Sequence, residues 1–182
     1  MEDLIQRLSE RLRHQPESKD VLGFAFRACA PSTQAVLAST ENRLGFRLPQ
    51  SLRDIYLNVA NGGFGPGYGL MGVEGGFTDD LGHTVADLYE SYRQFDPEDA
   101  SWQWPEQLLP MCHWGCVIYS VVDCSRSPAP IYFADISGKE PGEPMETILH
   151  FHKPSFEAWL SDWLDGKDLW GEVWGDDVNG DS

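Results

Sequence analysis

The spacing of hydrophobic residues changes along this chain, and the change restricts the folds that it can adopt. Up to about residue 60, hydrophobic side chains recur every three or four positions, which is the period of an amphipathic helix. Between residues 108 and 135 the period is two, as in strands with one buried face. Helical spacing returns after residue 155. Helices followed by a run of strands and a closing helix predict an α+β fold, in which helices pack on one sheet.

Five segments have helical spacing, and several carry a start or stop signal. They cover residues 1–14, 33–44, 50–60, 84–95 and 155–165. Ser32 or Thr33 is expected to cap the second segment, and Gly45 to end it, because glycine adopts the left-handed conformation that closes many helices. Gly62 and Gly63 are expected to end the third segment in the same way, with a positive φ at one of them.

The segments with a period of two predict the strands. Three of them are expected to form an antiparallel meander, with turns rich in Gly, Ser and Pro between them: Leu108–His113, Cys116–Asp123 and Ala129–Asp135. Thr147–His152 and Tyr68–Val73 are expected as further short strands, and Val21–Cys29 as strand or coil. The chain contains no internal repeat and no linker, so we expect a single domain.

A glycine-rich run, residues 62–76, contains the pattern G-x-G-x-x-G at Gly67, Gly69 and Gly72. This pattern binds a dinucleotide when a strand precedes it and a helix follows, because the N-terminus of that helix holds the phosphates. Here a predicted helix precedes the run, which contains no Lys or Arg. We therefore interpret the run as a turn that leads into a short strand.

The charge of the chain is strongly acidic and unevenly distributed. Thirteen Lys and Arg against 29 Asp and Glu give a net charge of −16. Residues 1–73 hold eight bases and seven acids, whereas residues 74–182 hold five bases, 22 acids and 16 of the 22 aromatic residues. This balance excludes a nucleic-acid binder that works through a broad basic face. An acidic, aromatic-rich half suits a basic protein partner, and the alternative is that the charge serves solubility alone.

One part of the acidic half combines the residue types that anchor protein interfaces. Its candidate partner-binding residues, all within residues 79–106, are Asp79, Asp80, Glu98, Asp99, Trp102 and Trp104. Because one residue separates the two tryptophans, an extended backbone places both indoles on the same side. Tryptophan beside charged residues is typical of binding hot spots. The alternative is that the tryptophans belong to the core.

Cysteine and histidine residues form two weak metal-site patterns. Cys112, His113 and Cys116 are closely spaced, but Cys116 opens a predicted strand and no second paired cluster follows, so buried thiols are the preferred interpretation. His150 and His152 would share one face of a strand and could hold a metal there, but exposure of both side chains to solvent is the preferred interpretation. The cysteines are expected to be reduced. No complete nucleophile or calcium-loop motif occurs, so we expect no catalytic residue, no metal and no cofactor.

The sequence does not predict a membrane segment or a leader peptide. It contains no run of eighteen hydrophobic residues, and its first fifteen residues are amphipathic and charged. The expected location is therefore the cytoplasm.

The run ENRLGFRLPQSLRDIYLNVANGG, Glu41–Gly63, resembles the signature of the SUKH superfamily, which includes the fungal Smi/Knr cell-wall assembly regulators and many bacterial proteins. The matching positions are Glu41, Leu44, Gly45, Leu48, Pro49, Leu52, Tyr56, Asn61, Gly62 and Gly63. Leu108–Cys124 is similar to the strand pair of the family, and Phe156–Leu160 resembles its last helix. The resemblance spans most of residues 32–165.

This resemblance implies an α+β fold with a mixed sheet flanked by helices. Together with the strand pattern, it leads us to expect a single domain with a mixed, mainly antiparallel sheet. It divides the chain into an N-terminal helical extension over residues 1–30, a SUKH-like domain over residues 31–168 and an acidic tail over residues 169–182. It also implies a binding scaffold rather than an enzyme, and bacterial members are regarded as immunity proteins that neutralise toxins, many of them nucleases.

We therefore expect a non-enzymatic protein-binding module, namely an immunity protein whose acidic surface occludes the active site of a basic toxin domain. A nuclease is one such toxin, since it needs a basic cleft for phosphates. Two alternatives stay open: a regulatory adaptor similar to the fungal cell-wall assembly regulators, and a sensor that binds a small molecule in an aromatic pocket. A toxin gene beside the gene for this chain would favour the immunity protein.

Overall fold

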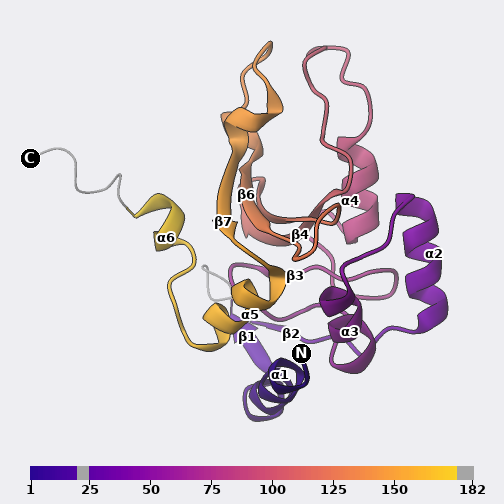
Figure 1. Cartoon of the computed structure of the whole chain (residues 1–182), viewed down its shortest axis with the longest axis vertical. Coiled ribbons are helices and arrows are strands. Elements are labelled where there is room, and N and C mark those ends of the chain that lie inside the picture. The colour runs from indigo at the N-terminus through magenta and orange to yellow at the C-terminus, as the bar shows by residue number, and fades with distance from the viewer. Residues whose placement is uncertain (20–24, 176–182) are drawn as a thin grey trace, which may run out of the picture.

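Five strands from the middle of the chain form one sheet, in the order β3-β4-β5-β6-β7 (Figure 1). They are β3 (Gly69–Leu70), β4 (Leu108–Gly115), β5 (Ile118–Asp123), β6 (Ile131–Asp135) and β7 (Leu149–Lys153). The structure, a computed structural model, describes residues 1–19 and 25–175. All neighbouring strands of this sheet are antiparallel. The predicted α+β fold and its meander are therefore confirmed.

The strands differ from the prediction at their ends. Cys116 and Val117 form the turn between β4 and β5, so Cys116 does not open the strand. Their φ angles are 49° and 59°, and two positive φ angles in succession are what a hairpin turn of type I′ requires. The predicted strand Thr147–His152 begins only at Leu149, because a short 3₁₀ helix, η2 (Met145–Ile148), precedes β7. Strand β3 is shorter than the predicted Tyr68–Val73.

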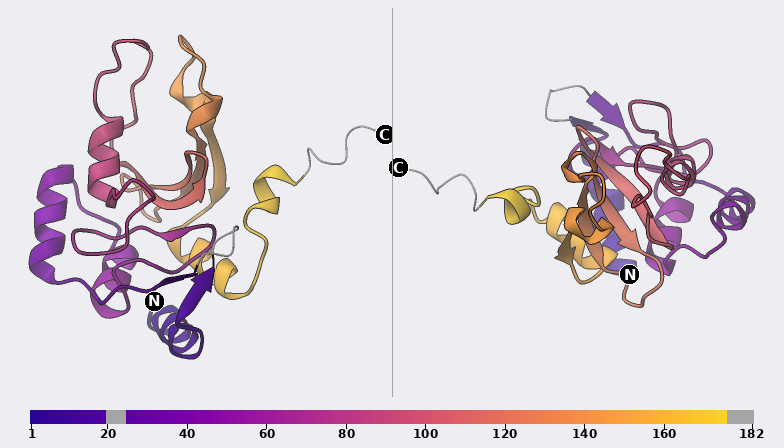
Figure 2. Two further views of the ribbon diagram at one scale, coloured as in Figure 1. Left: turned by 180° about the vertical axis from the view of Figure 1, so that it is seen from behind. Right: turned by 90° about the horizontal axis from the view of Figure 1, so that it is seen from above.

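Helices pack around this sheet. They are α1 (Glu2–His14), α2 (Gln34–Leu44), α3 (Gln50–Asn58), α4 (Val85–Tyr92), α5 (Phe156–Leu164) and the short α6 (Gly171–Trp174). Helix α4 packs against β4 with α2 beside it, and α5 and α6 pack against β7, as Figure 2 shows from two further sides. The predicted caps of α2 are present: the Thr33 side chain accepts from the N–H of Val36, and Gly45 ends α2 with a φ of 79°. Helix α3, in contrast, already ends at Asn58 with Val59 as its C-cap, so the prediction that Gly62 and Gly63 end it is wrong.

The run that carries the family resemblance supplies core contacts and backbone anchors. Leu52 and Tyr56 of α3 are fully buried, and the Tyr56 hydroxyl donates to the carbonyl oxygen of Met71 at 2.6 Å. Glu41 accepts from the N–H of Leu48 at 2.8 Å and forms an ion pair with Arg53 at 2.5 Å. These contacts fix the angle between α2 and α3. They give these matching residues a structural role.

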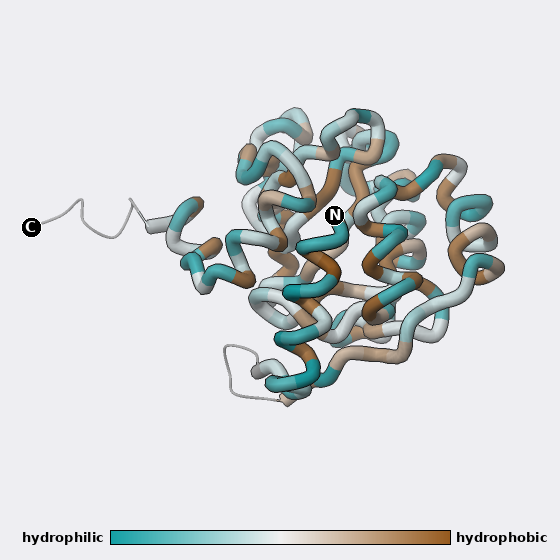
Figure 3. Tube along the Cα trace, turned by 60° about the horizontal axis from the view of Figure 1, so that its bottom comes forward, coloured by the Kyte–Doolittle hydropathy of each residue, from teal (hydrophilic) through white to brown (hydrophobic). Residues whose placement is uncertain are grey.

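The N-terminal segment packs on the rest of the protein. Leu8 of α1 is fully buried, Arg7 pairs with Asp165, and the Arg11 guanidinium lies 4.3 Å from the ring centroid of Trp163 in α5. Hydrophobic positions recur along α1, as the brown segments of Figure 3 show. After α1, two short strands, β1 (Glu17–Lys19) and β2 (Ala25–Arg27), pair antiparallel. Residues 21–24 of the predicted strand or coil lie outside the described residues.

The C-terminal segment covers part of the sheet before the described chain ends. The rings of Trp170 and Trp174 contact Phe133 of β6, with centroids 6.1 Å and 6.3 Å away. The first half of the predicted acidic tail is therefore packed against the sheet, and residues 176–182 lie outside the described residues.

Candidate functional site

One face of the sheet carries a chain of aromatic rings that connects the candidate residues. The register of β4 and β5 places His113 opposite Tyr119, and their rings stack with centroids 5.0 Å apart. Tyr119 meets Tyr92 of α4 at 6.1 Å. Tyr92 in turn contacts Trp102 at 5.8 Å and Trp104 at 4.9 Å. These contacts hold the segment after α4 against the sheet.

The two tryptophans lie side by side, as the sequence predicts, but they differ in exposure. Their ring centroids are 6.3 Å apart. Trp104 is 1% exposed, and its indole N–H donates to the carbonyl oxygen of Leu108 at 2.7 Å. Trp102 is half-buried and donates to the carbonyl oxygen of Tyr92 at 2.8 Å. The core alternative therefore describes Trp104, whereas part of Trp102 is accessible to a partner.

The adjacent candidates Asp79 and Asp80 have opposite environments. The Asp79 side chain is only 1% exposed, and it accepts from the backbone N–H groups of Leu81 and His83. The Asp80 side chain is 70% exposed. Asp79 therefore shapes the turn that leads to α4, and Asp80 presents its charge at the surface.

Two loops project together from the end of the molecule that lies away from α1 (Figures 1 and 2). One is the 93–107 loop between α4 and β4, and the other is the 136–148 segment between β6 and β7. We call them the loop pair. They contain seven acidic and two basic residues. Only the first loop contains partner-binding residues predicted from the sequence. The second loop has no sequence pattern that distinguishes it from an ordinary polar loop.

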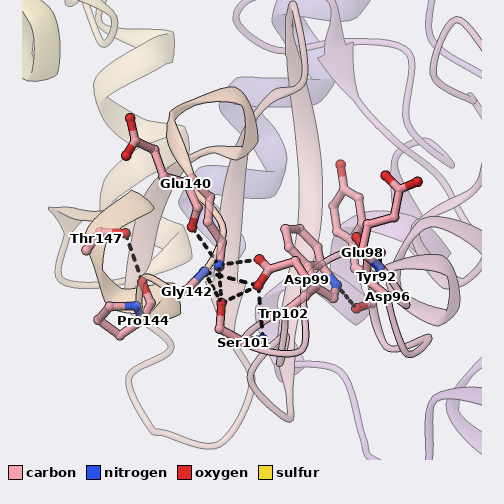
Figure 4. Close-up of polar contacts among 11 residues, drawn as sticks. Tyr92, Asp96, Glu98, Asp99, Ser101, Trp102, Glu140, Gly142, Pro144 and Thr147 are labelled. Atoms are coloured by element: carbon pink, nitrogen blue, oxygen red, sulfur yellow. Dashed lines mark hydrogen bonds and ion pairs between the residues drawn. The ribbon is translucent and has the colours of Figure 1, made fainter.

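A partly buried ion pair holds the two loops together (Figure 4). The Lys139 ammonium donates to the Asp99 carboxylate at 2.7 Å and to the Ser101 hydroxyl at 2.8 Å, and its side chain is buried. The N–H of Gly142 donates to Asp99 at 3.2 Å and to Ser101 at 3.0 Å. The hydrogen bond from Lys139 lowers the pKa of Asp99 well below its usual range. Asp99 is thus a loop clamp whose charge is already balanced within the protein.

All five basic residues of the acidic half, residues 74–182, form ion pairs. Each of the five lies within 3.1 Å of a carboxylate: Arg93 with Glu106, Arg126 with Asp123, Lys139 with Asp99, and both Lys153 and Lys167 with Asp162. In contrast, Glu98, Glu140 and Glu146 are exposed on the loop pair and form no ion pair among the residues that the structure describes. The loop pair therefore presents negative charge without a compensating base.

A cavity of about 290 Å³ adjoins the loop pair. Leu108, Tyr132 and Leu149 give it an apolar lining from three strands. Glu106 and Glu146, one from each loop, also line it. This arrangement can accept an apolar side chain that is flanked by positive charge.

The two predicted metal patterns take other roles. Cys112 is buried, and burial raises the pKa of its thiol, whereas Cys116 is exposed in the hairpin turn, so its predicted burial is wrong. His150 is exposed, as the sequence predicts. The predicted exposure of His152 is wrong, because its side chain is buried and its Nε2 atom lies 3.1 Å from Oε2 of Glu172 in α6. Residues 1–19 and 25–175 contain no group of three or more His, Cys, Asp or Glu that could hold a metal.

No helix in the described ranges is long and apolar enough to cross a membrane.

Comparisons with known proteins place the chain in a family. A search of the curated proteins found no match to the chain. The model of the SMI1 / KNR4 family (SUKH-1) matches residues 31–162, a segment that includes both loops of the loop pair. Because this match covers more than half of the chain, the protein belongs to the SMI1/KNR4 family (SUKH-1), a family of immunity proteins.

Proposed function

We propose that this protein is an immunity protein that neutralises a basic toxin domain by binding it with the loop pair. Family members bind protein toxins and are generally non-catalytic. The observation that carries the proposal is the uncompensated charge of the loop pair, whose two bases are already paired internally. An exposed surface of one sign attracts a partner of the opposite sign and accelerates their encounter.

Occlusion of the toxin's active site is the proposed mechanism. A toxin that cleaves nucleic acid needs a basic cleft for phosphates, and the carboxylates of Glu98, Glu140 and Glu146 can occupy that cleft in their place. The clamp between Lys139 and Asp99 keeps the loops in one arrangement before binding, which reduces the entropy lost on association. The adjoining apolar cavity offers a place for an anchoring side chain.

The test is protection of a bacterial host that produces, as the toxin, the polypeptide encoded beside the gene for this chain. Wild-type protein is expected to restore growth and to co-purify with that polypeptide. The double variant Glu98→Lys with Glu140→Lys, one change in each loop, is expected to lose both properties because it reverses the surface charge.

A matched control keeps the same change in net charge at a distant place. Glu2→Lys with Glu10→Lys alters two exposed residues of α1, at the opposite end of the molecule (Figure 1). This variant is expected to protect like the wild type. Full protection by the loop-pair variant would place the interface elsewhere, and failure of the wild-type protein to protect would favour the regulatory adaptor.

A further inference from the structure

A second and smaller cavity lies outside the loop pair. Its volume is about 160 Å³, and it is formed by β2, by β4 and by the turn at residues 77–80. Rings of Phe26, Tyr68 and Phe77 line it, together with the polar residues Asp80 and His113. The lining contains no Lys or Arg. Its polar groups therefore favour a ligand that donates hydrogen bonds and carries positive charge.

The polar part of this cavity has an unused acceptor. The His113 side chain is 8% exposed, and its Nδ1 atom is buried without a hydrogen-bond partner among the described residues. Nδ1 faces the Asp80 carboxylate, with Oδ2 4.0 Å away. A buried nitrogen without a partner is unfavourable unless a ligand or water satisfies it. Asp80 and His113 therefore leave a gap between two groups that could bind the same ligand.

Neutral imidazole suits this role. Burial lowers the pKa of His113 and outweighs the opposing effect of Asp80 and Asp79, so the ring is neutral near pH 7. A neutral ring has one nitrogen with a free lone pair, and a donor that faces Nδ1 selects the tautomer with the lone pair there. The neighbouring Asp79 adds negative potential, although its own oxygens already accept hydrogen bonds from the turn.

The aromatic part of the cavity favours a flat cation. The rings of Phe26 and Phe77 lie 5.4 Å apart, and the Tyr68 ring lies 5.1 Å from that of His113. A guanidinium group is planar, stacks on aromatic faces and donates several hydrogen bonds in fixed directions. Two acceptors that are 4.0 Å apart can bind neighbouring N–H groups of one such cation.

We propose that this cavity binds a guanidinium group. Asp80 and His113 Nδ1 accept hydrogen bonds from it, and the rings of Phe26, Tyr68 and Phe77 enclose it. The group can belong to an arginine of a protein partner or to a free guanidinium compound. The cavity itself does not depend on the loop pair, so it can be tested without a toxin.

The test is a titration of the purified protein with agmatine and with 1,4-diaminobutane, followed by NMR. Both probes carry two positive charges near pH 7, but only agmatine has a guanidinium group. Agmatine is expected to bind at least fivefold more tightly, to shift the ¹⁵N resonance of His113 Nδ1 and to shift the amides of residues 78–80. Asp80→Asn is expected to weaken it at least fivefold, and Glu98→Gln, a change of equal charge in the loop pair, to leave it unchanged.

Equal affinity for the two probes, or unchanged agmatine affinity in Asp80→Asn, would overturn the proposal. His113→Phe keeps the ring stack but removes the acceptor, and it is expected to lose agmatine binding at an unchanged melting temperature. Should that variant fail to fold, the ¹⁵N shift of His113 in the wild-type protein decides. Competition between agmatine and the toxin would identify an arginine of the partner as the source, and independent binding would identify a free guanidinium compound.

Discussion

At the scale of single residues, Gly62 and Gly63 share a backbone conformation with Gly45 but differ from it in surroundings. The three φ angles are 78°, 79° and 79°. A Cβ on Gly63 would lie 2.1 Å from the carbonyl oxygen of Arg27, and one on Gly62 would lie 2.5 Å from that of Leu70. A Cβ on Gly45 meets nothing within 4 Å. A side chain at Gly45 would therefore meet only the strain of the left-handed conformation. A side chain at Gly62 or Gly63 would meet the same strain and would also collide with a neighbouring backbone.

Replacement by alanine separates these two effects. Gly45→Ala is expected to lower the free energy of unfolding by about 1–2 kcal/mol, because only the left-handed conformation is strained. Gly63→Ala is expected to lower it by about 3 kcal/mol or more, because the backbone of Arg27 must also move. Denaturation in urea measures both values. Equal losses would show that the close approach to Arg27 has no energetic weight.

The same scale shows what the sequence could not predict about the site. Trp102 and Trp104 are equivalent in the sequence pattern, since both lie in an extended segment among acids. Trp104 donates to the carbonyl oxygen of Leu108 in β4 and is buried, whereas Trp102 donates to the carbonyl oxygen of Tyr92 at the end of α4 and stays partly exposed. Asp79 and Asp80 are likewise adjacent, and the turn they form decides which one is exposed.

At the scale of elements, α4 begins with a capping box. The Thr84 hydroxyl accepts from the N–H of Asp87 at 3.4 Å, and the Asp87 carboxylate accepts from the N–H of Thr84 at 3.0 Å. Arg43 of α2 donates to the same carboxylate at 2.7 Å. Partial burial raises the pKa of Asp87, but the hydrogen bonds from Arg43 and Thr84 outweigh it and bring the pKa to about 2.

This shift predicts how acid affects stability. An aspartate in the unfolded chain has a pKa of about 3.9, so the folded state binds this proton less readily. The stabilisation by ionised Asp87 is thus fully present above about pH 4 and is lost as the pH falls toward about 2. The difference in unfolding free energy between wild type and Asp87→Asn is therefore expected to shrink from pH 5 to pH 2. A difference that is constant over urea titrations in this range would contradict the prediction.

Helix α1 lies outside the family match but is packed against α5. Leu8→Ala is expected to lower the free energy of unfolding by about 2–5 kcal/mol, because it leaves a cavity at a fully buried site. Leu12→Ala, in the same helix but only partly buried, is the control and should cost less. Calorimetry should show one cooperative transition for each variant. Wild-type stability of Leu8→Ala would mean that α1 is independent of the core.

The helices and strands were more predictable than the contacts between distant segments of the chain, for a physical reason. Helix spacing, the caps at Thr33 and Gly45, and strand alternation all act within a few residues, so the sequence pattern contains them. The loop pair depends on a contact between Asp99 and Lys139, forty positions apart, for which no local pattern exists. Burial of His152 likewise depends on α6, twenty residues further along the chain.

At the scale of the whole molecule, internal pairing concentrates the net charge of −16 on part of the surface. Each of the five bases of the acidic half pairs with a carboxylate of that half. Glu98, Glu140 and Glu146 of the loop pair are exposed and form no ion pair among the described residues, and the loop pair lies at one end of the molecule (Figure 1). Charge of this kind changes the rate of association more than the strength of the complex.

The most direct test of the loop pair as the toxin-binding surface is the association rate constant with the toxin domain at two ionic strengths. At about 0.01 M the Debye length is about 30 Å, and at about 0.15 M it is about 8 Å, so the higher value screens exposed charges. Wild-type association is expected to slow at least tenfold between them. Glu98→Lys with Glu140→Lys is expected to associate slowly at both, whereas Glu2→Lys with Glu10→Lys follows the wild type. Salt-independent association of the wild type, or an unchanged rate in the loop-pair variant, would contradict the proposed function.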